Sequence, residues 1–164
     1  MAGLGVVYDV GANEAWFGEA QVAGHALVWQ LGGDGNGAKL SADLDVDPGL
    51  AWVLRCDRVD VPPRGVAYLH THPGGGIRCM IKGALEVEAH GDLTFYKPFE
   101  AWFENGSDPV RAFASQTAET AFVRVMLLPR EWEGKRTIRY VNPEDADKPK
   151  LQVATLFFDQ RIEL

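Results

Sequence analysis

Short strand-like stretches, separated by turns that contain Gly or Pro, run through most of this chain and restrict its fold more than any other feature. Two of them, residues 39–45 and 84–89, alternate polar and apolar residues, as a strand with one buried face does. No long stretch has the 3.6-residue period of an amphipathic helix. The other predicted strands are residues 25–31, 51–61, 66–72, 77–82, 93–96, 110–115, 120–128 and 151–158. The pattern predicts one all-β domain of antiparallel strands, a sandwich or a barrel.

Composition and charge exclude some partners. The formal net charge is −7 and no stripe of Lys and Arg stands out. Because binding to the phosphates of nucleic acids needs clustered basic residues, we expect no nucleic-acid partner. No apolar run approaches the ~18 residues of a membrane helix. The first basic residue is Lys39 and acidic residues break the early apolar stretches, so we expect no secretory signal and a cytoplasmic protein. Cys56 and Cys79 should then be reduced, with a disulfide between them as the alternative.

Two of the four histidines, His70 and His72, stand one residue apart at the end of an apolar run. Residues i and i+2 of a strand point to the same side, so the two rings should share one space. Neutral imidazole is the commonest protein metal ligand, which makes this pair the start of a metal site. A divalent metal usually needs a third protein ligand, and Glu100 or Glu104 is the candidate. The alternatives are two hydrogen-bonded histidines inside the protein and two solvated carboxylates.

The stretch Gly65-Val-Ala-Tyr-Leu-His70-Thr-His72, followed by Gly83, resembles the first motif of the cupin superfamily. Gly91, Pro98 and residues 104–109 resemble the second motif. The resemblance covers about residues 45–128 and implies a double-stranded β-helix, an antiparallel jelly-roll barrel with a small-molecule site at its mouth. Residues 1–44 would then be strands and loops that pack on the barrel. Residues 129–164 would be a linker and a strand that packs on its own barrel or on a partner's sheet edge in a homodimer.

The resemblance fails at two of the four usual metal ligands. The glutamate of the first motif is replaced by Gly76. The position of the second-motif histidine, which depends on the residue from which it is counted, falls on Glu100, Ala101 or Phe103. With Glu100 or Glu104 pointing inward, His70 and His72 would complete a two-His-one-carboxylate set of the kind that suits non-haem iron. Without either carboxylate, two imidazoles alone would bind metal weakly.

Arg78 supports a different site. It follows Gly76 by two residues and should lie on the same side of a regular strand. A guanidinium repels a bound divalent metal but attracts a carboxylate or phosphate group of a ligand. Arg78 is therefore a candidate ligand anchor, with an outward or ion-paired surface arginine as the alternative. Further ligand-binding candidates, each of which could instead be ordinary core packing, are Tyr68, Met80 and Trp102.

These residues lead to three hypotheses about function. The first is a metal-dependent enzyme of the dioxygenase or isomerase/lyase type, in which Fe, Mn, Ni or Zn held by His70 and His72 acts on a small oxygenated substrate. The second is a metal-free module that binds an anionic small molecule through Arg78. The third is a degenerate barrel retained for assembly through its C-terminal tail. The sequence shows no credible nucleophile–base pair, so no catalytic residue is assigned.

Overall fold

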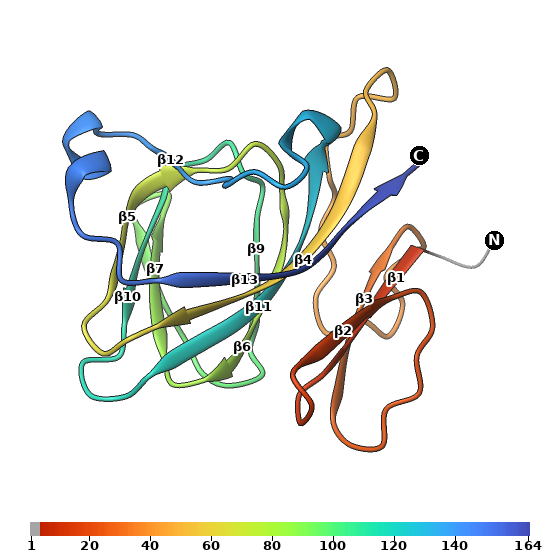
Figure 1. Ribbon diagram of the computed structural model, residues 1–164, viewed down its shortest axis with the longest axis horizontal. Helices are drawn as coiled ribbons and strands as arrows, with labels where there is room; N and C mark the ends of the chain where they lie inside the picture. The colour runs from red at the N-terminus through yellow and green to blue at the C-terminus, as the bar shows by residue number, and fades with distance from the viewer. Residues whose placement is uncertain (1–3) are drawn as a thin grey trace.

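The computed structural model describes residues 4–164, and antiparallel strands make up nearly all of its regular structure (Figure 1). The described part of the chain contains two short 3-10 helices, η1 (Arg130–Trp132) and η2 (Pro143–Asp147), and no α-helix. None of its helices is long and apolar enough to span a membrane. The strands are β1 (Leu4–Asp9), β2 (Glu14–Phe17), β3 (Ala26–Leu31), β4 (Trp52–Val61), β5 (Val66–Thr71), β6 (Gly76–Lys82), β7 (Leu85–Ala89), β8 (Asp92–Tyr96), β9 (Ala101–Glu104), β10 (Val110–Ala114), β11 (Thr120–Pro129), β12 (Arg139–Tyr140) and β13 (Val153–Ile162).

Two five-stranded sheets form the barrel. One has the strand order β12-β5-β10-β7-β8 and the other β13-β4-β11-β6-β9, and all pairs are antiparallel. Non-consecutive strands are neighbours in both sheets, as in a jelly roll. Figure 1 shows β13, β4 and β11 side by side across one wall of the barrel. The predicted all-β jelly-roll fold is confirmed.

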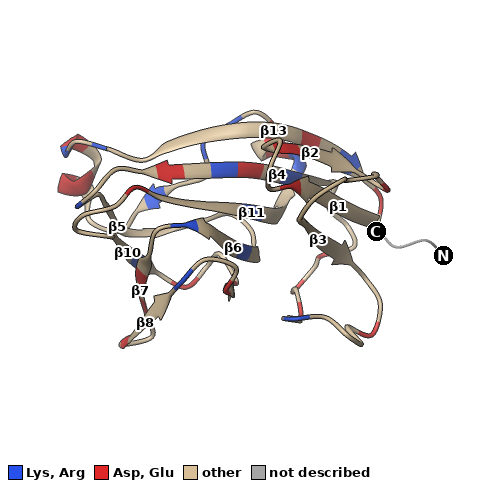
Figure 2. Ribbon diagram, turned by 90° about the horizontal axis from the view of Figure 1, so that it is seen from below, with Lys and Arg blue, Asp and Glu red and all other residues tan. Residues whose placement is uncertain are grey.

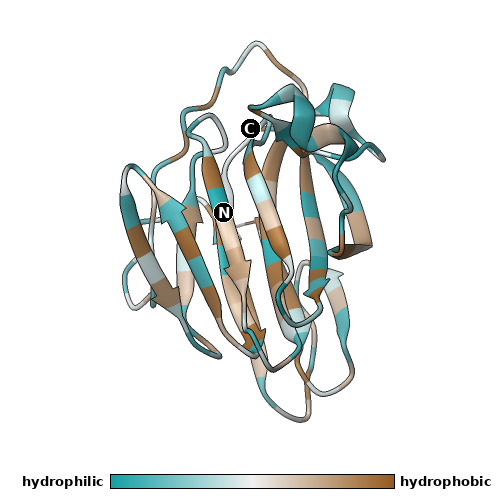
Figure 3. Ribbon diagram, turned by 90° about the vertical axis from the view of Figure 1, so that its left-hand side faces the viewer, coloured by the Kyte–Doolittle hydropathy of each residue, from teal (hydrophilic) through white to brown (hydrophobic). Residues whose placement is uncertain are grey.

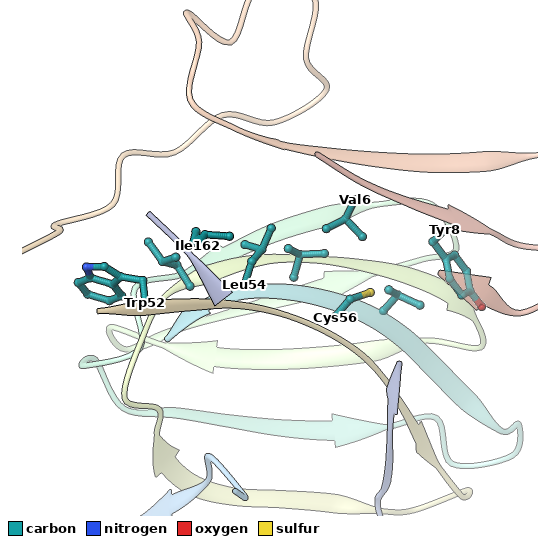
Figure 4. Packing of buried hydrophobic residues seen from close by; sticks show 9 residues of the cluster. Val6, Tyr8, Trp52, Leu54, Cys56 and Ile162 are labelled. Atoms are coloured by element: carbon teal, nitrogen blue, oxygen red, sulfur yellow. The ribbon is translucent and has the colours of Figure 1, made fainter. Parts of the chain in front are cut away.

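A third sheet, of order β2-β1-β3, covers the outer face of the second barrel sheet. Val6 and Tyr8 of β1 pack against Leu54 and Cys56 of β4, with Trp52 and Ile162 at one end of the cluster (Figure 4). The opposite face of β4 and β11 lines the barrel interior, so both faces of these strands are buried. This explains why their sequences are apolar on both sides, apart from a few charged residues.

Most of the predicted strands are present, and their ends lie within a few residues of the prediction. A tight hairpin joins β7 to β8: Ala89 pairs with Asp92, and the two residues between them, His90 and Gly91, have φ of 54° and 80°. Positive φ at both central residues is the requirement of a type I′ hairpin turn. Hydrophobic and hydrophilic residues alternate along many strands, as Figure 3 shows.

Three expectations are corrected. Residues 39–45 are not a strand; the side chain of Leu44 in this segment, like that of Val46 beyond it, packs on the core cluster of Val6 and Tyr8. The linker expected within residues 129–164 contains a short 3-10 helix, η2. Strands β9 and β12 were not predicted, and β1 and β2 lie within residues 1–44, where strands were expected but only residues 25–31 and 39–45 were assigned. Of the two alternatives for the C-terminal strand, β13 pairs with β4 of its own chain, and a homodimer remains a prediction. Cys56 and Cys79 are both buried and free.

Candidate functional site

The barrel encloses a cavity of about 500 Å³ between its two sheets. One part of its wall is apolar, with side chains such as Val87, Phe122 and Trp102. The remainder is strongly basic, because six lining residues are Arg or Lys and only two are Asp or Glu, in a chain whose net charge is −7. The six basic residues are Arg55, Arg78, Arg124, Lys135, Arg136 and Lys150. The cavity wall therefore has the opposite charge balance to the chain as a whole.

His70, on β5, and His72, directly after it, point into this cavity from the first sheet. Their Nε2 atoms lie 3.2 Å apart, so the predicted shared space exists. Nδ1 of His70 lies 2.6 Å from the carbonyl oxygen of Tyr68, which can only accept, so this nitrogen carries the proton and Nε2 presents a lone pair. Nδ1 of His72 lies 3.1 Å from Oγ1 of Thr137. If the Thr137 hydroxyl donates to His72, then His72 donates to His70 and both rings are satisfied while neutral.

Electrostatics favour this neutral pair. Burial lowers the pKa of His70, and the carbonyl of Tyr68 opposes the shift only in part. Burial also lowers the pKa of His72 well below its usual value, with Arg124 and Arg78 adding to the effect. At neutral pH the cavity therefore holds two uncharged imidazoles.

A β-bulge decides which side chains of β5 reach the cavity. Val110 of β10 pairs with His70, but Ala112 pairs with Ala67, so two steps along β10 match three along β5. Ala67 and His70 both line the cavity as a result, and Tyr68 does not. The Tyr68 ring instead lies 4.8 Å from the ammonium group of Lys148. The structure therefore does not bring Tyr68, a predicted ligand contact, to the cavity wall.

The other ligand-binding candidates divide between cavity and core. Trp102 and Arg78 line the cavity. Met80 does not; it is fully buried in a cluster with Leu85 and Val87, so it serves the core.

Arg78 is buried in the barrel wall, with 1% of its side chain exposed. Its Nη2 lies 2.8 Å from Oε2 of Glu104, and its Nη1 donates to the carbonyl oxygen of Gly76 at 2.7 Å. The other oxygen of Glu104 accepts from the indole N–H of Trp102 at 2.8 Å. Glu104 is therefore held by two donors of the wall, and Arg78 is an ion-paired interior residue rather than a surface one.

A second arginine, Arg124 of β11, was not anticipated from the sequence. Its Nε and Nη2 donate to the two carboxylate oxygens of Asp57 at 2.6 and 3.0 Å. Asp57 and Arg124 both line the cavity. A sequence signal existed, because a charged residue inside an otherwise apolar buried strand must find a partner in the interior. Figure 2 shows such charges interleaved along β4.

The segment after β11 closes part of the cavity. Arg55 of β4 forms an ion pair with Asp159 at 2.6 Å and donates to the carbonyl oxygens of Trp132 and Lys135. Asp159 also accepts from the backbone N–H of Gly134. This cluster holds residues 130–137 against the barrel and so positions Thr137 beside His72.

The residues present do not fit the divalent metal that cupin motifs imply. A Cβ atom at Gly76 would lie 2.0 Å from the carbonyl oxygen of Val125, so no side chain can stand where the motif glutamate belongs. Glu104 is engaged by Arg78 and Trp102. Glu100 is exposed, and its side chain accepts from the backbone N–H of Lys97, away from the histidines. Within residues 4–164 no three His, Cys, Asp or Glu side chains gather in a metal-binding group.

Comparisons with known proteins concern the fold alone. No family model and no curated protein matches the chain. Among solved structures, KdgF from Halomonas sp. is 23% identical over 52% of this chain and 84% of its own, with a TM-score of 0.42. The polyketide cyclase RemF from Streptomyces resistomycificus is 20% identical over 57% and 63%, with a TM-score of 0.43. A predicted oxalate decarboxylase from Thermotoga maritima is 21% identical over 44% and 64%, with a TM-score of 0.39.

This chain spans less than two thirds of the length of the last two proteins. Its own strands form two antiparallel five-stranded sheets, with a His-x-His pair entering the barrel from β5. The fold of this chain is an antiparallel jelly-roll barrel.

Proposed function

We propose that the barrel binds a small organic anion with an apolar body, and that binding requires no metal ion. The observation that carries the proposal is the cavity wall, in which two interior arginines, Arg78 and Arg124, stand beside an extended apolar surface. Each arginine is offset by one carboxylate, whereas Lys135, Arg136 and Lys150 add further positive charge. A concave surface of one sign raises the local concentration of a ligand of the opposite sign.

The apolar part of the wall determines what the rest of the ligand should be. Side chains of Val59, Leu85, Val87 and Phe122 offer no hydrogen bonds to a sugar-like or strongly polar body. A cavity of about 500 Å³ accommodates an aromatic or medium-chain aliphatic group. The proposed ligand class is therefore an aryl or alkyl acid.

The first hypothesis, a metal-dependent dioxygenase or isomerase/lyase, is not what these residues favour. It needs a third ligand for His70 and His72, and the nearby carboxylate of Glu104 is bound to Arg78. We assign the two neutral imidazoles the role of hydrogen-bonding groups in the cavity wall. In that role His70 Nε2 can accept a hydrogen bond from the ligand, and rotation of the His72 ring can direct its N–H toward a polar group of the ligand.

Isothermal titration calorimetry of protein treated with EDTA tests the proposal. Each acid is titrated beside its uncharged amide: 2-naphthoate with 2-naphthamide, and octanoate with octanamide. Hydrogen bonds to charged groups contribute about 1.5–3 kcal/mol, so at least one acid should bind about tenfold or more tightly than its amide. Three results would contradict the proposal: neither acid binds, acid and amide bind equally, or binding appears only after Zn²⁺, Mn²⁺, Ni²⁺ or Fe²⁺ is added.

Two matched variants locate the binding event. Ala112 lines the cavity, whereas Ala118 lies exposed in the loop between β10 and β11. Ala112→Phe should fill part of the cavity and abolish binding of the acid, and Ala118→Phe should leave it unchanged. An acid that still binds Ala112→Phe with the wild-type affinity binds somewhere other than the barrel.

A further inference from the structure

We propose that Arg124, rather than Arg78, is the residue that holds the ligand, and that the group it holds is a single carboxylate. This inference rests on the proposed function, because it assigns the anchor within the same cavity. It was not suggested by the sequence motif, which points to Arg78 only.

The first argument is the register of the strands. Asp57 of β4 pairs with Arg124 of β11, Arg124 pairs with Arg78 of β6, and Arg78 pairs with Trp102 of β9. These four residues form one row across the inner face of the sheet. Two arginines therefore stand directly opposite each other on neighbouring strands, an arrangement that is unfavourable without an anion. Asp57, on β4, is one end of the row, and Glu104, on β9, lies two residues from Trp102 at the other end, so both carboxylate partners come from strands outside the arginine pair.

The second argument is the use of the hydrogen-bond donors. Both terminal nitrogens of Arg78 are engaged by the protein: Nη1 by the carbonyl oxygen of Gly76 and Nη2 by Glu104. Arg124 binds Asp57 through Nε and Nη2 only. Its Nη1, with two N–H donors, has no hydrogen-bond partner within residues 4–164. Arg124 is also more open to the cavity, with 12% of its side chain exposed against 1% for Arg78.

The third argument concerns the charge that the row can accept. The two arginines and their two carboxylate partners are neutral as a whole, so these four side chains do not compensate two added negative charges. One carboxylate between the arginines relieves their mutual repulsion and is balanced by the other basic residues of the cavity wall, Lys135, Arg136 and Lys150. A dianionic phosphate costs more to desolvate in the same place. The chemistry therefore favours a monocarboxylic acid over a phosphate ester.

Charge-matched double variants test the assignment without leaving a buried charge unpaired. Arg124→Gln with Asp57→Asn removes one cation and its own anion, and Arg78→Gln with Glu104→Gln does the same for the other pair. The control is Arg58→Gln with Asp60→Asn, which removes a more exposed Arg–Asp ion pair of β4 that lies outside the cavity. Each protein is titrated with 2-naphthoate, 2-naphthamide and 2-naphthyl phosphate, and with octanoate if wild type binds that acid instead.

The Arg124 double variant should lose about tenfold or more in affinity for the acid and less than about threefold for the amide. The Arg78 double variant and the control should each lose less than about threefold. Three results would overturn the inference: equal acid binding by wild type and the Arg124 double variant, a larger loss of affinity in the Arg78 double variant, or tighter binding of the phosphate than of the acid. If the Arg124 double variant does not fold, Arg124→Lys should weaken acid binding more than Arg78→Lys, and the reverse order would overturn it.

The two proposals fail in different ways. Wild-type protein that binds no acid contradicts the proposed function itself. Wild-type protein that binds an acid, together with an unaffected Arg124 double variant, contradicts only the assignment of the anchor.

Discussion

Gly76 stands where cupin motifs carry a metal-binding glutamate, and replacing it by Ala should strongly destabilise the protein. The added Cβ would lie 2.0 Å from the carbonyl oxygen of Val125 and 2.8 Å from Cα of Met126, both in the backbone of the neighbouring strand β11. Ordinary contact begins at 3.4 Å, so β6 and β11 would have to separate by roughly 1.4 Å at this point.

The magnitude follows from what that separation breaks. Gly76 lies in the ladder between β6 and β11, and Leu127 N–H donates to the carbonyl oxygen of Gly75 beside it at 2.9 Å. Losing two or three backbone hydrogen bonds at about 1 kcal/mol each, with overpacking of about 1–3 kcal/mol, gives a cost of about 3–6 kcal/mol. That is a large fraction of the ~5–15 kcal/mol that stabilises a typical domain. Gly76→Glu should cost at least as much, so restoring the motif residue should not create a metal site.

Urea denaturation followed by tryptophan fluorescence measures the effect as a change in the free energy of unfolding. The control is Gly24→Ala, because a Cβ at Gly24 would meet nothing within 4 Å. That variant should stay within about 1 kcal/mol of wild type. A Gly76→Ala protein as stable as Gly24→Ala, or a Gly76→Glu protein that folds and gains a bound divalent metal, would refute the reasoning.

Two further measurements probe the charges of the wall. Glu104→Gln should lower the free energy of unfolding by about 3–5 kcal/mol, because it leaves the buried Arg78 without its anion. The control Glu119→Gln removes a carboxylate that is 73% exposed in its ion pair, and should change the free energy of unfolding by less than about 1 kcal/mol. Equal effects of the two substitutions would show that the interior ion pair does not contribute to stability. Because burial lowers the pKa of His70 and His72, the unfolded chain binds protons that the folded chain does not as pH falls below about 6.5. The free energy of unfolding should therefore decrease as pH falls from about 6.5 to 5, with a limiting slope of about 2.7 kcal/mol per pH unit for the two histidines. Replacing both histidines by Gln should flatten this pH dependence. An unchanged slope in that variant would contradict the neutral state of the two rings.

The fold and the direction of the two histidine rings could be predicted because they follow from local rules. Period-two patterns, turn residues and the i, i+2 spacing of His70 and His72 each depend on a few neighbouring residues. The strand predicted at residues 39–45 is wrong because this segment alternates polar and apolar residues without pairing with another strand. Its apolar Leu44 packs on the core, and this pattern cannot be told from that of a hydrogen-bonded strand by sequence.

The details of the site depend on register, which the sequence does not show. In a regular strand Tyr68 would point into the cavity, as His70 does. One extra residue in β5 between Ala67 and His70 turns Tyr68 away from it. Arg124 meets Asp57 and Arg78 only because three strands that are distant in sequence pair at those positions. The loss of the motif glutamate was visible as Gly76, but the reason that no side chain fits there is the backbone of β11.

The most direct test is a high-resolution crystal structure of the protein as purified or soaked with the acid that binds most tightly. We expect the acid in the barrel, with a carboxylate oxygen within hydrogen-bond distance of Nη1 of Arg124 and its body against Phe122. Density for a metal ion between the Nε2 atoms of His70 and His72, with no acid on Arg124, would contradict metal-free capture of an organic anion.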